Sequence, residues 1–103
     1  MNIDNNLRHL LENETKIHLA EIRFLYQKLD RQLGLNGAMV PITFGFDTDR
    51  LGAYTPGFGQ DEEEFHFSLL FIGYCVTKPL SKDDRMDLYK HEYAHYMQYN
   101  MDI

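Results

Sequence analysis

The chain has 103 residues, a length that fits one compact domain, so residues 1–103 are treated as a single domain. Its 44% hydrophobic residues are enough to build a core and exclude an intrinsically disordered protein. Ten basic residues against sixteen acidic ones give a formal charge of −6, which argues against direct binding of nucleic acid or of an anionic membrane surface. The single cysteine, Cys75, cannot form an intrachain disulfide, so we expect a cytoplasmic protein.

The N-terminal third has the periodicity of an amphipathic helix. Apolar residues recur there at spacings of three and four: Leu7, Leu10, Leu11, Ile17, Ala20, Phe24, Leu25 and Leu29. Asp4 is the expected N-cap, and Gly34 is the expected stop after Leu33. The pattern predicts one long helix, or two helices with a break near Asn13, because asparagine and threonine favour caps over helix interiors.

The middle of the chain, residues 36–77, changes to the pattern of β-strands. Alternating apolar residues over Val40–Phe46 predict a first strand, and Leu51–Tyr54 predicts a short second one. Phe65–Ile72 is apolar on both faces and predicts a longer, mostly buried strand. We therefore expect a small sheet of three strands, mostly antiparallel. The longest apolar run here, residues 67–76, is far shorter than the roughly 20 residues of a membrane span.

A second helix is predicted from about Lys82 to Tyr99. Ser81 is its expected N-cap, and Asp83 and Asp84 favour the positive end of its dipole. The fold class is accordingly α+β, with a long N-terminal helix, a small sheet and a C-terminal helix.

This last helix contains the sequence His91-Glu92-Tyr93-Ala94-His95, an H-E-x-x-H motif. Residues four apart lie on one face of a helix, so His91 and His95 can bind one metal ion at about 2 Å from each ring. Glu92 lies about 100° round the helix, where it can accept a proton from the water that the metal activates. This arrangement is typical of zinc hydrolases, and zinc is the expected cofactor, although Ni²⁺ and Co²⁺ suit the same nitrogens.

Together with the Arg50–Tyr54 and Phe65–Phe71 strands, the segment from Lys90 to Tyr96 resembles the SprT-like zinc metallopeptidases, a gluzincin-type branch of the zincins. The resemblance covers about residues 38–101. It implies that a helix backs a small sheet and that a second helix carries the active site. It also implies that His91 and His95 are metal ligands and that Glu92 is the general base.

Relatives of this kind supply a third metal ligand, usually a histidine, from a segment downstream of the motif. After His95 the sequence offers only Asp102 among acids, and the helical rise places it about 10 Å further along the axis. We therefore expect that residues 1–103 lack the part that carries the third ligand, so that the truncated chain could be inactive. Alternatively, His66 on the preceding strand could supply the ligand, or a second chain in a homodimer could do so.

Other candidate residues have simpler structural interpretations. His9 and His18 are expected at the surface, and Cys75 is expected to be a small buried residue. The acidic run Asp61–Glu64 is expected in a solvated loop. The tyrosine stripe of the second helix is expected to serve packing rather than chemistry: Tyr89, Tyr93, Tyr96 and Tyr99.

The sequence thus predicts a zinc-dependent peptidase that acts on a peptide or protein substrate, with Phe65–Ile72 as an edge strand that aligns an extended peptide. The alternative is a non-catalytic, metallopeptidase-like module that binds a protein partner or a metal ion. The chain length on the C-terminal side of the motif motivates this second hypothesis.

Overall fold

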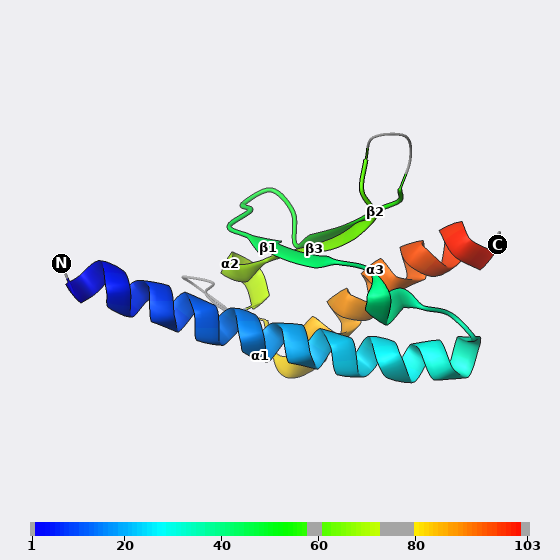
Figure 1. Ribbon diagram of the computed structural model, residues 1–103, viewed down its shortest axis with the longest axis horizontal. Helices are drawn as coiled ribbons and strands as arrows, with labels where there is room; N and C mark the ends of the chain where they lie inside the picture. The colour runs from blue at the N-terminus through cyan, green and yellow to red at the C-terminus, as the bar shows by residue number, and fades with distance from the viewer. Residues whose placement is uncertain (1, 58–60, 73–79, 102–103) are drawn as a thin grey trace.

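The computed structural model describes residues 2–57, 61–72 and 80–101 and has the expected α+β architecture (Figure 1). Two long helices and a short one accompany a three-stranded sheet and a 3₁₀ turn. In chain order the elements are α1 (Asn2–Leu33), η1 (Gly37–Met39), β1 (Ile42–Gly45), β2 (Gly52–Thr55), β3 (Glu64–Ser68), α2 (Leu69–Ile72) and α3 (Lys82–Met101). None of the helices within the described ranges is both long and apolar enough to cross a membrane.

Helix α1 is continuous, and its start differs from the predicted one. It begins at Asn2, so Asp4 is not its N-cap, and no break occurs near Asn13. The small helix penalty of each asparagine or threonine, a few tenths of a kcal/mol, is less than the cost of nucleating a second helix. Gly34 ends the helix as predicted, because its φ of 69° is a left-handed conformation that glycine adopts easily.

The buried face of α1 is not centred on the predicted apolar stripe. Leu10, Ile17 and Phe24 are 52%, 59% and 72% exposed, respectively. The buried residues are Ile22, Tyr26 and His18, the last of which was expected at the surface, while Leu25 and Leu29 of the predicted stripe are partly buried against the core. Spacing alone therefore predicted only part of the packing face, because a tyrosine and a histidine contribute to it.

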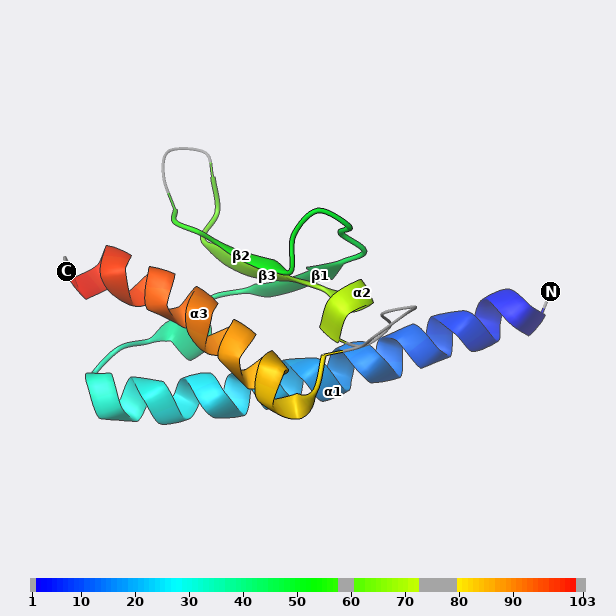
Figure 2. The same cartoon turned by 180° about the vertical axis from the view of Figure 1, so that it is seen from behind.

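The sheet is mixed and has the order β1-β3-β2 (Figure 2). β2 pairs with β3 in antiparallel orientation, as predicted, with Tyr54 opposite Phe65. β1 pairs with β3 in parallel, with Ile42 opposite Phe65, so the expectation of a mostly antiparallel sheet is wrong for this pair. Alternating apolar residues fix which face a strand buries, but they do not specify its neighbour.

β3 ends at Ser68, and the apolar residues that follow form the single turn α2. Leu69 and Ile72, three residues apart, are both buried by this turn. The predicted strand was therefore too long, because a short apolar run does not distinguish a buried strand from a buried helical turn. Cys75 lies outside the described residues.

An aromatic core joins the two long helices to one face of the sheet. Phe65 and Phe67 of the central strand are fully buried, and the Tyr26 ring lies 4.8 Å from that of Phe65. From α3, the rings of Tyr93 and Tyr89 lie 5.0 Å from Tyr26 and 5.2 Å from Phe67, respectively. The buried side of α3 is thereby held against α1 and the sheet, which determines where its opposite side points.

Candidate metal centre

Helix α3 presents the motif from its middle, away from either fraying end. Its N-terminus has the predicted cap, because the backbone N–H of Asp84 donates to Ser81 Oγ at 3.2 Å. The helix continues to Met101, six residues beyond His95. The backbone that carries His91 and His95 is therefore regular and hydrogen-bonded on both sides.

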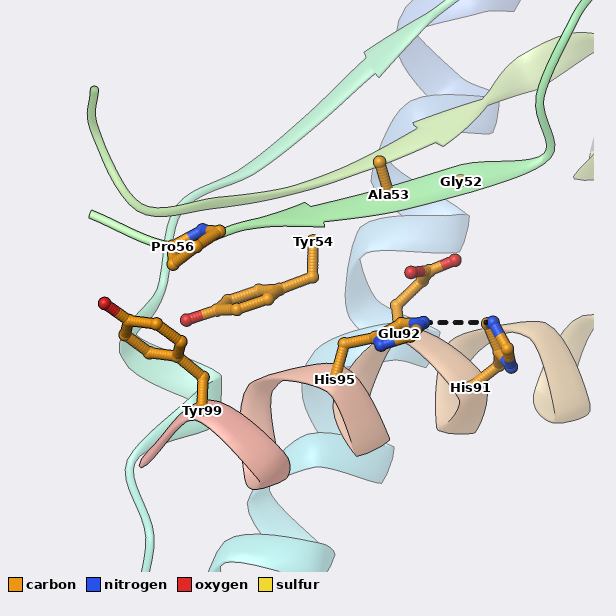
Figure 3. A pocket seen from close by; sticks show the side chains of 8 residues that line it. All are labelled: Gly52, Ala53, Tyr54, Pro56, His91, Glu92, His95 and Tyr99. Carbon is orange, nitrogen blue, oxygen red and sulfur yellow. Dashed lines mark hydrogen bonds between the residues drawn. The ribbon is translucent and has the colours of Figure 1, made fainter. Parts of the chain in front are cut away.

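His91 and His95 lie next to each other on the exposed side of α3. Their Nε2 atoms are 3.2 Å apart, and the imidazole planes are nearly perpendicular, at 89°. Two nitrogens bound at about 2.0–2.1 Å to one tetrahedral zinc ion are separated by about 3.3–3.4 Å. The observed separation thus fits a shared metal ion with little movement of either ring, and Figure 3 shows the two imidazoles facing each other.

Glu92 completes the group. Its side chain is only 4% exposed, and its carboxylate points toward β2 in Figure 3. One ligand atom from each of His91, Glu92 and His95 lies within 4.8 Å of the others, and among the described residues no other group of three such side chains could hold a metal ion. Burial raises the pKa of the Glu92 carboxyl above its ordinary value, although the two histidines oppose this shift.

The three side chains line a pocket of about 440 Å³ between α3 and β2 (Figure 3). The opposite wall comes from the edge strand and the residue after it. The lining residues are Gly52, Ala53, Tyr54, Pro56, His91, Glu92, His95 and Tyr99. The group that can hold a metal ion is therefore accessible from a cleft large enough for part of a ligand.

The wall formed by β2 is an open sheet edge within the described part of the chain, because β2 lies at the end of the strand order. The backbone N–H of Phe65 donates to Pro41 O on the β1 side, whereas the N–H of Ser68 donates to Leu51 O on the β2 side. Antiparallel pairs alternate between hydrogen-bonded and non-bonded positions. It follows that the N–H and C=O groups of Gly52 and Tyr54 point away from β3, toward the open edge.

His66, the strand residue considered as a further ligand, is not part of this group. Its neighbours Phe65 and Phe67 face the helices, so its ring lies on the other face of the sheet. There His66 Nε2 contacts Asp47 Oδ2 at 2.5 Å, and Nδ1 contacts Thr43 Oγ1 at 2.8 Å. Both ring nitrogens are engaged, so the structure does not support His66 as a metal ligand.

The other residues that the sequence singled out lie in different parts of the fold. Tyr89, Tyr93 and Tyr96 are buried in the core, as predicted for a packing stripe, whereas Tyr99 is 45% exposed and lines the pocket. His9 is exposed as predicted, and Asp102 lies outside the described residues.

Sequence reasoning missed the contribution of β2 to the site. Gly52, Tyr54 and Pro56 carry no motif that would assign them to it. The only available signal was the short apolar strand before a proline. That signal does not indicate which helix the strand faces.

The chain matches no known protein family, and comparisons with curated proteins and with solved structures also find no significant match. The geometry of the pocket and the motif itself are therefore the features that indicate a function.

Proposed function

We propose that the protein is a zinc-dependent peptidase of the H-E-x-x-H type, as the resemblance to SprT-like metallopeptidases implies. The observation that carries this proposal is the 3.2 Å separation of the Nε2 atoms of His91 and His95 in an open pocket beside Glu92. Two neighbouring imidazoles and an adjacent carboxylate are among the protein groups that metal-assisted hydrolysis uses, and a third protein ligand would complete the site.

His91 and His95 would hold the metal ion through their Nε2 atoms. When bound, zinc would polarise the peptide carbonyl and lower the pKa of the attacking water toward about 7. Glu92 would take a proton from that water as the water oxygen forms a bond to the carbonyl carbon. The carboxyl would then give this proton to the amide nitrogen as the C–N bond breaks. A buried carboxylate with a raised pKa is a better proton acceptor than an exposed one, which suits this role.

The open edge of β2 supports a peptide substrate. An extended peptide that pairs with this edge would receive and donate backbone hydrogen bonds at Gly52 and Tyr54, directly opposite the histidines. The prediction that Phe65–Ile72 is the edge strand that aligns a peptide is wrong, because β3 is the central strand and has no open edge. The pairing of a peptide is therefore assigned to β2.

The experiment that tests this proposal compares the chain with its Glu92→Gln variant. We expect the zinc-loaded chain to cleave fluorescently labelled casein and to stop when zinc is chelated. The variant should retain zinc but lose cleavage by at least a hundredfold, because general-base catalysis contributes about 10²–10⁴-fold. Glu12→Gln, at an exposed position on α1, is the matched control and should cleave normally. Full cleavage by Glu92→Gln would contradict the proposal.

A second function is favoured by one observation, namely that a ligand atom of Glu92 lies within 4.8 Å of those of both histidines. If Glu92 itself ligates the metal, the site is a three-ligand metal-binding module without a base. Zinc titration of Glu92→Gln separates the two functions, because a ligand role predicts weaker zinc binding and a base role predicts unchanged binding. A third ligand from a second chain would instead make the zinc content follow the dimer fraction on dilution.

A further inference from the structure

The carboxylate of Asp30, in the last turns of α1, joins three parts of the fold. Its Oδ1 accepts hydrogen bonds from the Gly37 N–H at 2.8 Å and from the Tyr93 hydroxyl at 2.7 Å. Its Oδ2 accepts a bond from the Ala38 N–H at 2.9 Å. One side chain thus ties the C-terminal part of α1 to the start of η1 and to α3.

Tyr93 is the residue through which this contact reaches the motif. It lies two residues after His91 and two before His95, so it occupies the opposite side of α3 from the histidine pair. Its side chain is 2% exposed, and its hydroxyl donates a hydrogen bond to Asp30 Oδ1 at 2.7 Å. The Tyr93 side chain is therefore held both by packing and by this bond.

Gly37 closes the contact from the other side. A Cβ atom at this position would lie 2.6 Å from Tyr93 Cε2, closer than real Cβ contacts. The backbone of η1 is consequently packed directly on the Tyr93 ring. The ring has a fixed surface beneath it and a fixed acceptor at its hydroxyl, which together restrict rotation of α3 about its axis.

Such rotation would matter at the pocket. Side-chain ends lie about 5–6 Å from a helix axis, so a rotation of about 20° moves them by about 2 Å. The separation between His91 and His95 is internal to α3 and would not change. Their distance from the open edge of β2 would change, and misplacement by about 1 Å can cost about a hundredfold in rate.

We propose that Asp30 is a positioning residue that sets the rotation of α3 through the Tyr93 hydroxyl and so places the histidine pair opposite β2. The effect on catalysis rests on the proposed peptidase function, whereas the effect on helix orientation does not. Asp30 touches no reacting atom and would act only through Tyr93.

The experiment measures the rotation directly in the metal-free protein. Backbone N–H residual dipolar couplings along α3 oscillate with the helical period. The couplings of β2 and β3 fix the reference frame, and in that frame the phase of the oscillation reports the rotation of α3 about its axis. We expect the phase to shift by 10° or more in Asp30→Ala and in Tyr93→Phe. It should stay unchanged in Asp30→Asn, because the asparagine Oδ1 can still accept the bonds from the Gly37 N–H and the Tyr93 hydroxyl, and the bond that is lost, from the Ala38 N–H to Oδ2, does not involve α3. Ser68→Ala, which loses one buried hydroxyl away from α3, is the control for general destabilisation.

Zinc affinity and casein cleavage supply the second measurement. The Kd of Tyr93→Phe for zinc should lie within about threefold of that of the unaltered chain. Its rate of casein cleavage should be at least tenfold lower. An unchanged phase in Asp30→Ala and Tyr93→Phe would overturn the inference, as would an equal shift in Asp30→Asn. Failure of the unaltered chain to cleave casein would count against the peptidase function alone, because the phase measurement needs neither zinc nor substrate.

Discussion

Arg85 of α3 donates two hydrogen bonds to the carboxylate of Glu21 of α1, from Nε at 3.0 Å and from a terminal nitrogen at 3.1 Å. Both side chains are less than one-fifth exposed. Burial alone would raise the pKa of Glu21, but the hydrogen bond and charge of Arg85, with the Tyr89 hydroxyl, lower it overall. This pair ties the first half of α3 to α1 before the chain reaches the histidines.

We predict that Arg85→Ala lowers the free energy of unfolding by about 1.5–3 kcal/mol, because hydrogen bonds to a charged, partly buried group are worth that much. Urea unfolding at pH 7 measures the loss. Arg50→Ala is the matched control: its guanidinium lies 3.8 Å from Asp47 and is 53% exposed, so the loss should be below about 1 kcal/mol. Equal losses in the two variants would contradict the structural role of the Arg85–Glu21 pair.

The buried histidine of α1 makes the stability depend on pH. His18 is 4% exposed, its Nε2 has no hydrogen-bond partner among the described residues, and its Nδ1 lies 3.4 Å from the Tyr89 hydroxyl. Burial lowers its pKa below the ordinary 6.5, and Arg85 adds to this shift, whereas Glu14 and Glu21 oppose it. The unfolded chain therefore takes up a proton more readily than the folded one.

We predict that the folded state loses stability as the pH falls below about 6.5, and that His18→Gln reduces this loss. Glu92 acts in the opposite direction, because its raised pKa favours the folded state as its carboxyl is protonated. The comparison is therefore made in a Glu92→Gln background, with urea midpoints at pH 7.5, 6.5 and 5.5. Identical pH slopes with and without His18 would show that this residue is not the source.

Local patterns in the sequence predicted the helices and the metal-binding group well, because both depend on contacts a few residues apart. The Ser81 cap, the Gly34 stop and the common face of His91 and His95 all follow from helix geometry, and the structure confirms each of them. The two histidines that the motif places on one face of α3 are also the residues that line the pocket.

Contacts between distant segments were not predictable in the same way. The alternation in β1 and β2 does not reveal that β3 inserts between them, and this insertion decides which edge stays open beside α3. Similarly, no helical spacing shows that His18 is buried while Phe24 is exposed. Such outcomes depend on the aromatic packing between α1, β3 and α3, which only the assembled fold defines.

Two glycines of the α1–β1 connection should respond differently to alanine. We predict that Gly37→Ala costs about 1–3 kcal/mol, because the new methyl group would overlap the Tyr93 ring and lie 3.1 Å from Tyr96. Gly34→Ala has open space for its methyl group but keeps a positive φ, so it should cost about 1–2 kcal/mol. Thermal unfolding of both variants gives the comparison.

The origin of each loss can be separated by a second substitution. Replacing Gly34 by asparagine should recover part of the stability, since asparagine tolerates the left-handed conformation. The loss that Gly37→Ala causes should be smaller in a Tyr93→Leu background than in the unaltered chain, because leucine leaves room for the methyl group. An equal loss in the two backgrounds would contradict a steric origin.

The histidine pair predicts how zinc alters stability. A ligand that binds only the folded state stabilises it by about 2.7 kcal/mol at a free concentration 100 times its Kd. We expect such a zinc-dependent rise in the unfolding midpoint of the unaltered chain and its loss in His91→Ala and in His95→Ala, because one imidazole cannot chelate.

His9→Ala removes an exposed histidine of α1 and should keep the full rise. His66→Gln should also keep it, since the ring of His66 is bonded to Asp47 on the other face of the sheet. A zinc-dependent rise that persists in His91→Ala would place the ion elsewhere and remove the basis of the proposed site.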